Sequence, residues 1–196
     1  MALLSERECG MKQNNKIKVL TKEIVLALLP KIDHELAKQN KQIQVTLLGG
    51  VALLLQNFIT RSTNDIDVFP NKDADYFEKV CRKLKIPVQI VALTSTVDSQ
   101  NASVVNNYRG RFLTIDSIPA EDLIRSKLER FLKHDPDDIY AVIDHVQLPY
   151  EKFKAIVQEM LSYFIGNPRS LILSSQIVVE RKYPQHLEDF KKTVKY

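Results

Sequence analysis

The sequence predicts an α+β fold, in which strands and helices mix up to Ile118 and helices follow. Short apolar or β-branched runs that stop at glycine or polar residues alternate with amphipathic stretches before Ile118. After Ile118, apolar residues recur mainly at helical spacing. We therefore expect a core over residues 16–118, in which helices flank a small mixed sheet, and a helical C-terminal part over residues 119–196 packed on it.

The predicted core elements alternate along the chain. An amphipathic helix is expected over residues 21–40, and Pro30 would bend or split it. A short buried helix is expected over residues 51–58. A longer amphipathic helix is expected over residues 71–85, with Asp73 as its cap. Strands are expected over residues 43–50, 64–69 and 87–93. A polar loop follows over residues 94–103, and a hairpin over residues 104–116 turns near Arg109-Gly110.

The C-terminal part is predicted from helix-start signals and periodicity. One helix begins with proline and acids near residue 118, and a second begins at Asp135 as cap with Pro136 in its first turn. The stretch at Ile177-Val178-Val179 is compatible with a helix or a strand. The remaining predicted helices cover residues 149–164, 170–184 and 186–192.

Composition favours a protein of the reducing cytoplasm. The chain has 196 residues, 44% hydrophobic and 27% charged, and lacks the roughly 20-residue apolar run of a membrane span. Cys9 and Cys81 give no disulfide framework, and the N-terminus lacks the apolar stretch of a secretory signal. Residues 1–15, with a second methionine at Met11, are expected to form a flexible extension. The net charge of +4 mildly favours anionic partners.

Two acids in one predicted strand are the first chemical signal. Asp65 and Asp67 would share one face of the strand, with Cα atoms about 7 Å apart, while Ile66 and Val68 face the core. Unpaired carboxylates on a sheet face repel each other, and a divalent cation removes that cost. Mg²⁺ is commonly held by one or two carboxylates plus substrate phosphates, so this spacing fits Mg²⁺ or Mn²⁺.

A glycine pair just before these acids is the second signal. Gly49 and Gly50 join a predicted strand to a helix, where glycine allows close backbone approach and exposed N–H groups attract anions. Amides and acids together would hold a nucleoside triphosphate and its metal. The expected chemistry is attack on the α-phosphate with loss of pyrophosphate.

The stretch LLGGVALLL…RSTNDIDVF resembles the nucleotidyltransferase superfamily, which has the DNA polymerase β-like fold. Its form is similar to that of bacterial nucleotidyltransferases related to abortive-infection toxins of toxin–antitoxin systems. The resemblance covers about residues 43–143, and its second motif is AEDLIRSKLERFLKHDPDDIYAVI. It implies an NTP substrate, an RNA, protein or small-molecule acceptor and an antitoxin partner. No membrane association is expected, because long apolar runs are missing.

The resemblance also implies site residues. Gly49, Gly50, Arg61 and Thr63 would bind the nucleotide, although Arg61 could instead pair with a structural acid and Thr63 could form the turn. Lys127 and Asp138 correspond to the later motif, where a surface lysine and a helix-start acid are the alternatives.

Two positions depart from the superfamily pattern. Gly50 stands where a serine is frequent, so a hydroxyl contact to phosphate would be missing. Asp116 is the candidate third catalytic and metal-binding carboxylate, because alternation puts it on one face with Phe112 and Thr114. If Asp116 is not the third acid, Lys127 and Asp138 would complete the site. Two alternative functions remain. The chain could be a non-catalytic nucleotide-binding or regulatory relative that acts through a partner protein, or it could be a basic RNA-binding protein.

Overall fold

The structure is a computed structural model that describes residues 19–91 and 103–195. The expected extension at residues 1–15 and nearly all of the expected loop at residues 94–103 lie outside the described residues. The strands are β1 (Ile43–Leu48), β2 (Ile66–Val68), β3 (Val88–Ile90), β4 (Val105–Arg109) and β5 (Leu113–Ser117). The helices are α1 (Lys22–Ala37), α2 (Gly49–Leu55), α3 (Ala74–Lys83), α4 (Ala120–Arg130), α5 (Asp135–Val146), α6 (Tyr150–Tyr163), α7 (Pro168–Lys182) and α8 (Leu187–Thr193), with a 3₁₀ turn at Pro184–His186.

The five strands form one mixed sheet in the order β3-β2-β1-β5-β4. β1 is parallel to β5 and antiparallel to β2, while β2 is parallel to β3 and β4 is antiparallel to β5. The predicted α+β class and the hairpin at Arg109-Gly110 are confirmed. The centre of the sheet is β1, which places the strand that precedes the glycine pair between the strands that carry Asp67 and Asp116.

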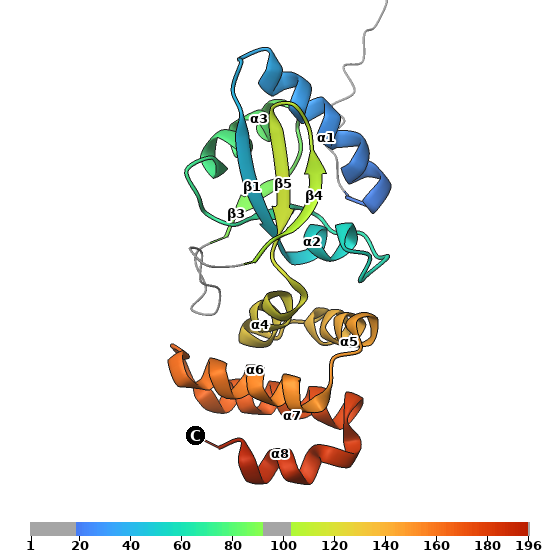
Figure 1. Cartoon of the computed structure of the whole chain (residues 1–196), viewed down its shortest axis with the longest axis vertical. Helices are drawn as coiled ribbons and strands as arrows, with labels where there is room; N and C mark the ends of the chain where they lie inside the picture. The colour runs from blue at the N-terminus through green and yellow to red at the C-terminus, as the bar shows by residue number, and fades with distance from the viewer. Residues whose placement is uncertain (1–18, 92–102, 196) are drawn as a thin grey trace, which may run out of the picture.

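The two faces of the sheet differ because side chains alternate along each strand. Val45 and Leu47 of β1 are buried, and α1 and α3 pack on the sheet (Figure 1). Gln44 and Thr46 of β1 point to the opposite, more exposed face. That face also carries Asp67 and Asp116, since Asp67 pairs with Leu48 and Asp116 pairs with Thr46. The predicted acids therefore lie on the polar side of the sheet.

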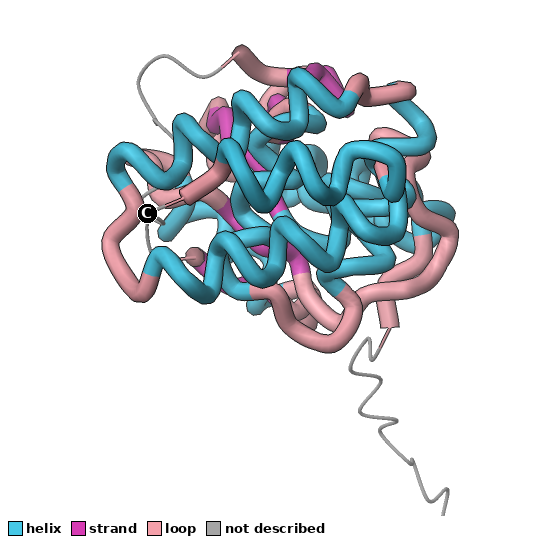
Figure 2. Tube along the Cα trace, turned by 90° about the horizontal axis from the view of Figure 1, so that it is seen from below, coloured by secondary structure: helices cyan, strands magenta, loops and turns pink. Residues whose placement is uncertain are grey.

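The helices after Ile118 form the C-terminal part of the molecule. α4 and α5 lie between the sheet and the helices α6, α7 and α8 (Figure 1). Figure 2 shows the same helices from below, in front of the strands. Within the described ranges, none of the helices is long and apolar enough to cross a lipid bilayer. The position of α4 and α5 makes them the helices that meet the core.

Several local predictions change in the structure. Pro30 does not split α1, which runs unbroken from Lys22 to Ala37. Asp73 is the N-cap residue of α3, as predicted, but its side chain makes no capping hydrogen bond, because its carboxylate accepts one from the backbone N–H of Gln44 at 3.1 Å. Asp135 is the first residue of α5 and not its cap, since its carboxylate bonds the preceding turn and two basic side chains.

The ambiguous stretch Ile177-Val178-Val179 is helical, as part of α7. Val178 and Val179 are fully buried there, so packing against the other helices decides against the strand that their β-branched side chains would also favour.

Candidate active site

The glycine pair makes a close contact that no other residue type would permit. Gly49 has φ +65°, and a Cβ atom added to it would lie 1.9 Å from Oδ2 of Asp67. A Cβ atom on Gly50 would lie 2.6 Å from Oγ1 of Thr63. The turn from β1 to α2 therefore brings Asp67 and Thr63 directly against backbone. The predicted proximity of the acids and the glycine pair is present.

Asp65 and Asp67 flank Ile66 as predicted, with Ile66 and Val68 buried in the core. Among the described residues, no group donates a hydrogen bond to either carboxylate. Burial, and then the negative charge of Asp65, raise the pKa of Asp67 to about 6, although Arg130 and Lys127 act in the opposite direction. The acid pair is thus partly buried and incompletely neutralised by protein groups.

These acids line a cavity of about 350 Å³, here named the charged cleft. One wall comes from the core, and the other comes from α4, α5 and the turn between them. The lining residues are Gly50, Arg61, Ser62, Thr63, Asn64, Asp65, Asp67, Gln89, Lys127, Arg130, Leu132, Lys133, His134 and Asp135. Gly50, Arg61, Thr63, Asp65, Asp67 and Lys127 are predicted site residues, so segments far apart in the sequence meet here.

A chain of ion pairs forms the second wall of the charged cleft. Lys127 is 2% exposed, and its Nζ lies 2.9 Å from Oδ1 of Asp135 and 2.6 Å from Oδ2 of Asp138. Asp138 accepts two hydrogen bonds from Arg61, at 3.2 and 2.5 Å. Asp135 accepts two from Arg130, at 2.9 and 3.1 Å. Lys127 is therefore buried and not the surface lysine of the alternative interpretation.

The electrostatics of this ion-pair chain favour its charged form. Burial opposes ionisation of Asp135, but hydrogen bonding to Arg130 and the charge of Lys127 lower its pKa below the usual value. Three basic groups (Arg61, Lys127 and Arg130) face two carboxylates (Asp135 and Asp138), which leaves one net positive charge. Arg61 thus has the structural acid partner that was its alternative role, and it also lines the charged cleft.

Sequence reasoning missed Arg130, Lys133 and the partner role of Asp135. Arg130 and Asp135 lie at opposite ends of the turn between α4 and α5, and Asp135 was interpreted as a helix cap. A signal was present, because a basic residue five positions before an acid can meet it across such a turn. The periodicity of each helix alone does not show that the turn is this tight.

Asp116 is placed apart from the other predicted acids. Its carboxylate is 1% exposed and accepts hydrogen bonds from the side-chain amides of Gln44 at 2.6 Å and Asn106 at 2.9 Å. Asp116 lies across β1 from Asp67 and is displaced along it, since their partners are Thr46 and Leu48. The described residues contain no group of three or more histidine, cysteine or acidic side chains that could hold a metal ion. Asp65 and Asp67 are brought together, and Asp116 is not brought to them.

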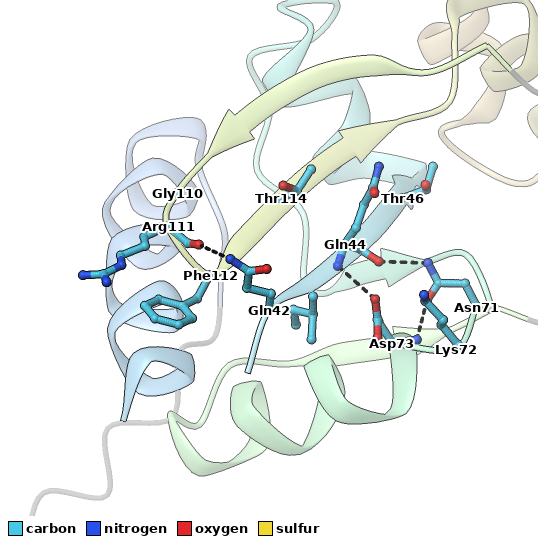
Figure 3. A pocket seen from close by; sticks show the side chains of 11 residues that line it. Gln42, Gln44, Thr46, Asn71, Lys72, Asp73, Gly110, Arg111, Phe112 and Thr114 are labelled. Carbon is cyan, nitrogen blue, oxygen red and sulfur yellow. Dashed lines mark hydrogen bonds between the residues drawn. The ribbon is translucent and has the colours of Figure 1, made fainter. Parts of the chain in front are cut away.

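A cavity larger than the charged cleft lies elsewhere on the polar face of the sheet (Figure 3). It measures about 850 Å³ and is bordered by Gln44, Thr46 and Thr114, the loop at Asn71–Asp73 and the hairpin tip. None of the predicted site residues lines it. The side chains of Asn71 and Asp73 hold the loop to the strand by hydrogen bonds with the backbone carbonyl and N–H of Gln44, as the dashed lines in Figure 3 show. We base the site on the smaller charged cleft, because that is where unpaired acids and basic groups converge.

Comparison with known proteins identifies a family. Residues 25–191 match the sequence model of a family described as nucleotidyltransferase of unknown function (DUF6036). No curated protein and no solved structure is significantly similar to the chain. The match covers both the core and the C-terminal helices.

Proposed function

Because the chain belongs to this nucleotidyltransferase family of unknown function, we propose that it transfers a nucleoside monophosphate from an NTP to an acceptor in a Mg²⁺-dependent reaction. An acceptor oxygen would bond to the α-phosphorus, the bond to pyrophosphate would break, and the acceptor would release its proton. Mn²⁺ would be an alternative to Mg²⁺.

The observation that carries this proposal is the pair of under-neutralised acids facing a wall of basic side chains across one cleft. A metal–triphosphate complex has matching charges, since the cation needs carboxylates and the phosphates need cations. The pKa of Asp67, raised by burial first and then by Asp65, shows that protein groups alone neutralise this carboxylate incompletely, and a cation would supply the missing charge.

All of the predicted residues except Asp116 and Asp138, together with Arg130, have a role in this proposal. Asp65 and Asp67 would hold the metal, which when bound would withdraw charge from the phosphate oxygens. Arg61 and Arg130 each use one edge of the guanidinium on a carboxylate, and the remaining N–H groups would bind phosphate. Lys127 would add the charge that keeps this wall positive. Gly49 and Gly50 would let the phosphates approach the backbone, beside the hydroxyl of Thr63.

The acceptor and the biological setting go beyond the family assignment. The likeness to abortive-infection toxins supports an RNA or protein acceptor, with a small molecule as the other option, and an antitoxin partner in the bacterial cytoplasm. The non-catalytic alternative is supported by the position of Asp116, because the amides of Gln44 and Asn106 occupy both of its carboxylate oxygens.

The experiment measures pyrophosphate release and label transfer from α-labelled NTPs with Mg²⁺, using cellular RNA, protein and small-molecule fractions as acceptors. Asp65→Ala and Asp67→Ala are expected to lower the rate at least about 100-fold, since even indirect metal contacts are worth 10–100-fold. Asp75→Ala, an exposed acid on α3, is the control. Transfer at the wild-type rate in both variants would contradict the proposal. Thermal stabilisation by Mg²⁺ and NTP without any pyrophosphate release would select the non-catalytic alternative.

A further inference from the structure

A second, narrower pocket adjoins the charged cleft. The two cavities share Asp67, Lys127 and Arg130, so a single ligand can extend from one into the other. The narrow pocket has a volume of about 210 Å³ and lies between the end of β1, Val91 after β3, and the last turns of α4. It is therefore a side chamber of the proposed phosphate site and not a separate surface feature.

The walls of the narrow pocket differ in chemistry from those of the cleft. Of the described residues that line the charged cleft, Leu132 is the one aliphatic side chain. The narrow pocket is bordered by Leu48, Gly49 and Val91, and by Lys127 and Arg130, whose methylene stems are apolar. Its polar lining residues besides these two are Asp67, Ser126 and Glu129. This chamber can therefore accept an apolar group that the polyanion-binding cleft would not favour.

The size of the narrow pocket limits what can enter it. Its 210 Å³ equals the volume of about seven water molecules at roughly 30 Å³ each. That is enough for a planar ring system but small beside the roughly 300–1,000 Å³ of pockets that enclose whole drug-sized ligands. The group that fits is one ring system joined to an anionic chain, with the junction close to Asp67.

We propose that the narrow pocket bordered by Leu48, Val91 and Ser126 binds the nucleobase of the nucleotide whose phosphates occupy the charged cleft. This inference rests on the proposed function, which supplies the nucleotide, and adds where its base lies. Gly49 also borders this pocket, and its missing side chain leaves room for the carboxylate of Asp67, which lines both cavities.

Ser126 offers a way to fill this pocket without disturbing the charges. It lies on α4, and its hydroxyl donates a hydrogen bond to the carbonyl of Leu123 at 2.9 Å. Ser162 on α6 makes the same contact three residues back, to the carbonyl of Glu159 at 2.7 Å, and lines neither cavity. Ser126→Leu and Ser162→Leu are therefore a matched pair that differ in where the added side chain goes.

The test compares the binding of two ligands by calorimetry, each with Mg²⁺: a non-hydrolysable NTP analogue and inorganic tripolyphosphate, which lacks a base. Ser126→Leu is expected to weaken the NTP analogue about tenfold and to leave tripolyphosphate unchanged, whereas Ser162→Leu changes neither. Val91→Ser, which removes apolar wall without adding bulk, is expected to weaken the NTP analogue in the same direction.

The outcomes separate this inference from the proposed function. An unchanged affinity of Ser126→Leu for the NTP analogue, or an equal loss for both ligands in a variant that melts like the wild type, would overturn the nucleobase assignment alone. A wild-type protein that binds neither ligand would overturn the proposed function together with it.

Discussion

Asp67 is a single residue whose surroundings disfavour its own charge. Burial, followed by the charge of Asp65, raises its pKa from 3.8 to about 6. The folded protein therefore binds this proton more tightly than the unfolded chain does, and folding stability falls as the pH rises from about 4 to about 6. Above about pH 6 the full loss of folding stability is present, and below about pH 4 this loss disappears. Such a cost is expected where a side chain is kept for a ligand and not for the fold.

Replacing the carboxylate by an amide should therefore stabilise the protein in a pH-dependent way. Asp67→Asn is expected to raise the free energy of unfolding at pH 8 by up to about 3 kcal/mol, at roughly 1.4 kcal/mol for each pKa unit. The gain should vanish below pH 4, where Asp67 is protonated in both states. Thermal melting at pH 4 and pH 8 measures this, with Asp75→Asn on α3 as control. A gain of equal size at both pH values would show that the charge is not its cause.

Single residues also show how far sequence reasoning reaches. The acid pair, its shared face and its contact with the glycine turn were predictable, because strand alternation and glycine geometry act within a few residues. Asp116 was assigned to the correct face, but its capture by Gln44 and Asn106 depends on the pairing of three strands. Side-chain partners contributed by different strands leave no periodic signal in the chain.

Two helices and the turn that joins them supply the basic wall of the charged cleft. Periodicity located α4 and α5 but gave no reason for acids at both Asp135 and Asp138 beyond helix-start preference. The reason is tertiary, since Lys127 enters between the two carboxylates from the preceding helix. The turn is closed by the backbone N–H of Leu132, which donates to Asp135 at 2.7 Å. One buried lysine thus fixes the angle between two helices and the position of two arginines.

Removing this lysine should be costly, because it leaves buried carboxylates with less compensation. Lys127→Met is expected to destabilise the protein by about 3–5 kcal/mol, the usual result of deleting one partner of a buried ion pair. Lys133→Met, at an exposed position in the adjoining turn, should change stability by less than about 0.5 kcal/mol. Urea denaturation of the three proteins makes the comparison. Equal stabilities for the two variants would mean that Lys127 has no structural role.

At the scale of the whole molecule, the ion pair between Arg61 and Asp138 links the core to the C-terminal part at the candidate site. Arg61 precedes β2 in the core, and Asp138 lies on α5, 77 positions further along the chain. Arg61 is 38% exposed and Asp138 is 1% exposed, so the pair lies at the edge of the buried region. The function that we propose depends on this junction, since neither part alone carries both the acids and the basic wall.

A double-mutant cycle measures how strongly the two parts are coupled. Arg61→Met and Asp138→Asn are expected to show a coupling of about 1.5–3 kcal/mol, as for hydrogen bonds to a charged group. The exposed pair Arg82 and Glu78 on α3 is the reference, where the coupling should stay below about 0.5 kcal/mol. If both cycles give the same small coupling energy, the ion pair between Arg61 and Asp138 does not stabilise the contact between the two parts.

The bridge between Arg61 and Asp138 also restricts motion. Many transferases close two lobes around a substrate by hinge bending, but here an ion pair already joins the core to the C-terminal part beside the charged cleft. Separating the core from the C-terminal part would break the ion pair of Arg61 and expose the carboxylate of Asp138, which is otherwise buried. A nucleotide would therefore bind to a preformed site, because the conformational entropy of ordering the walls of the site is already lost when the protein folds.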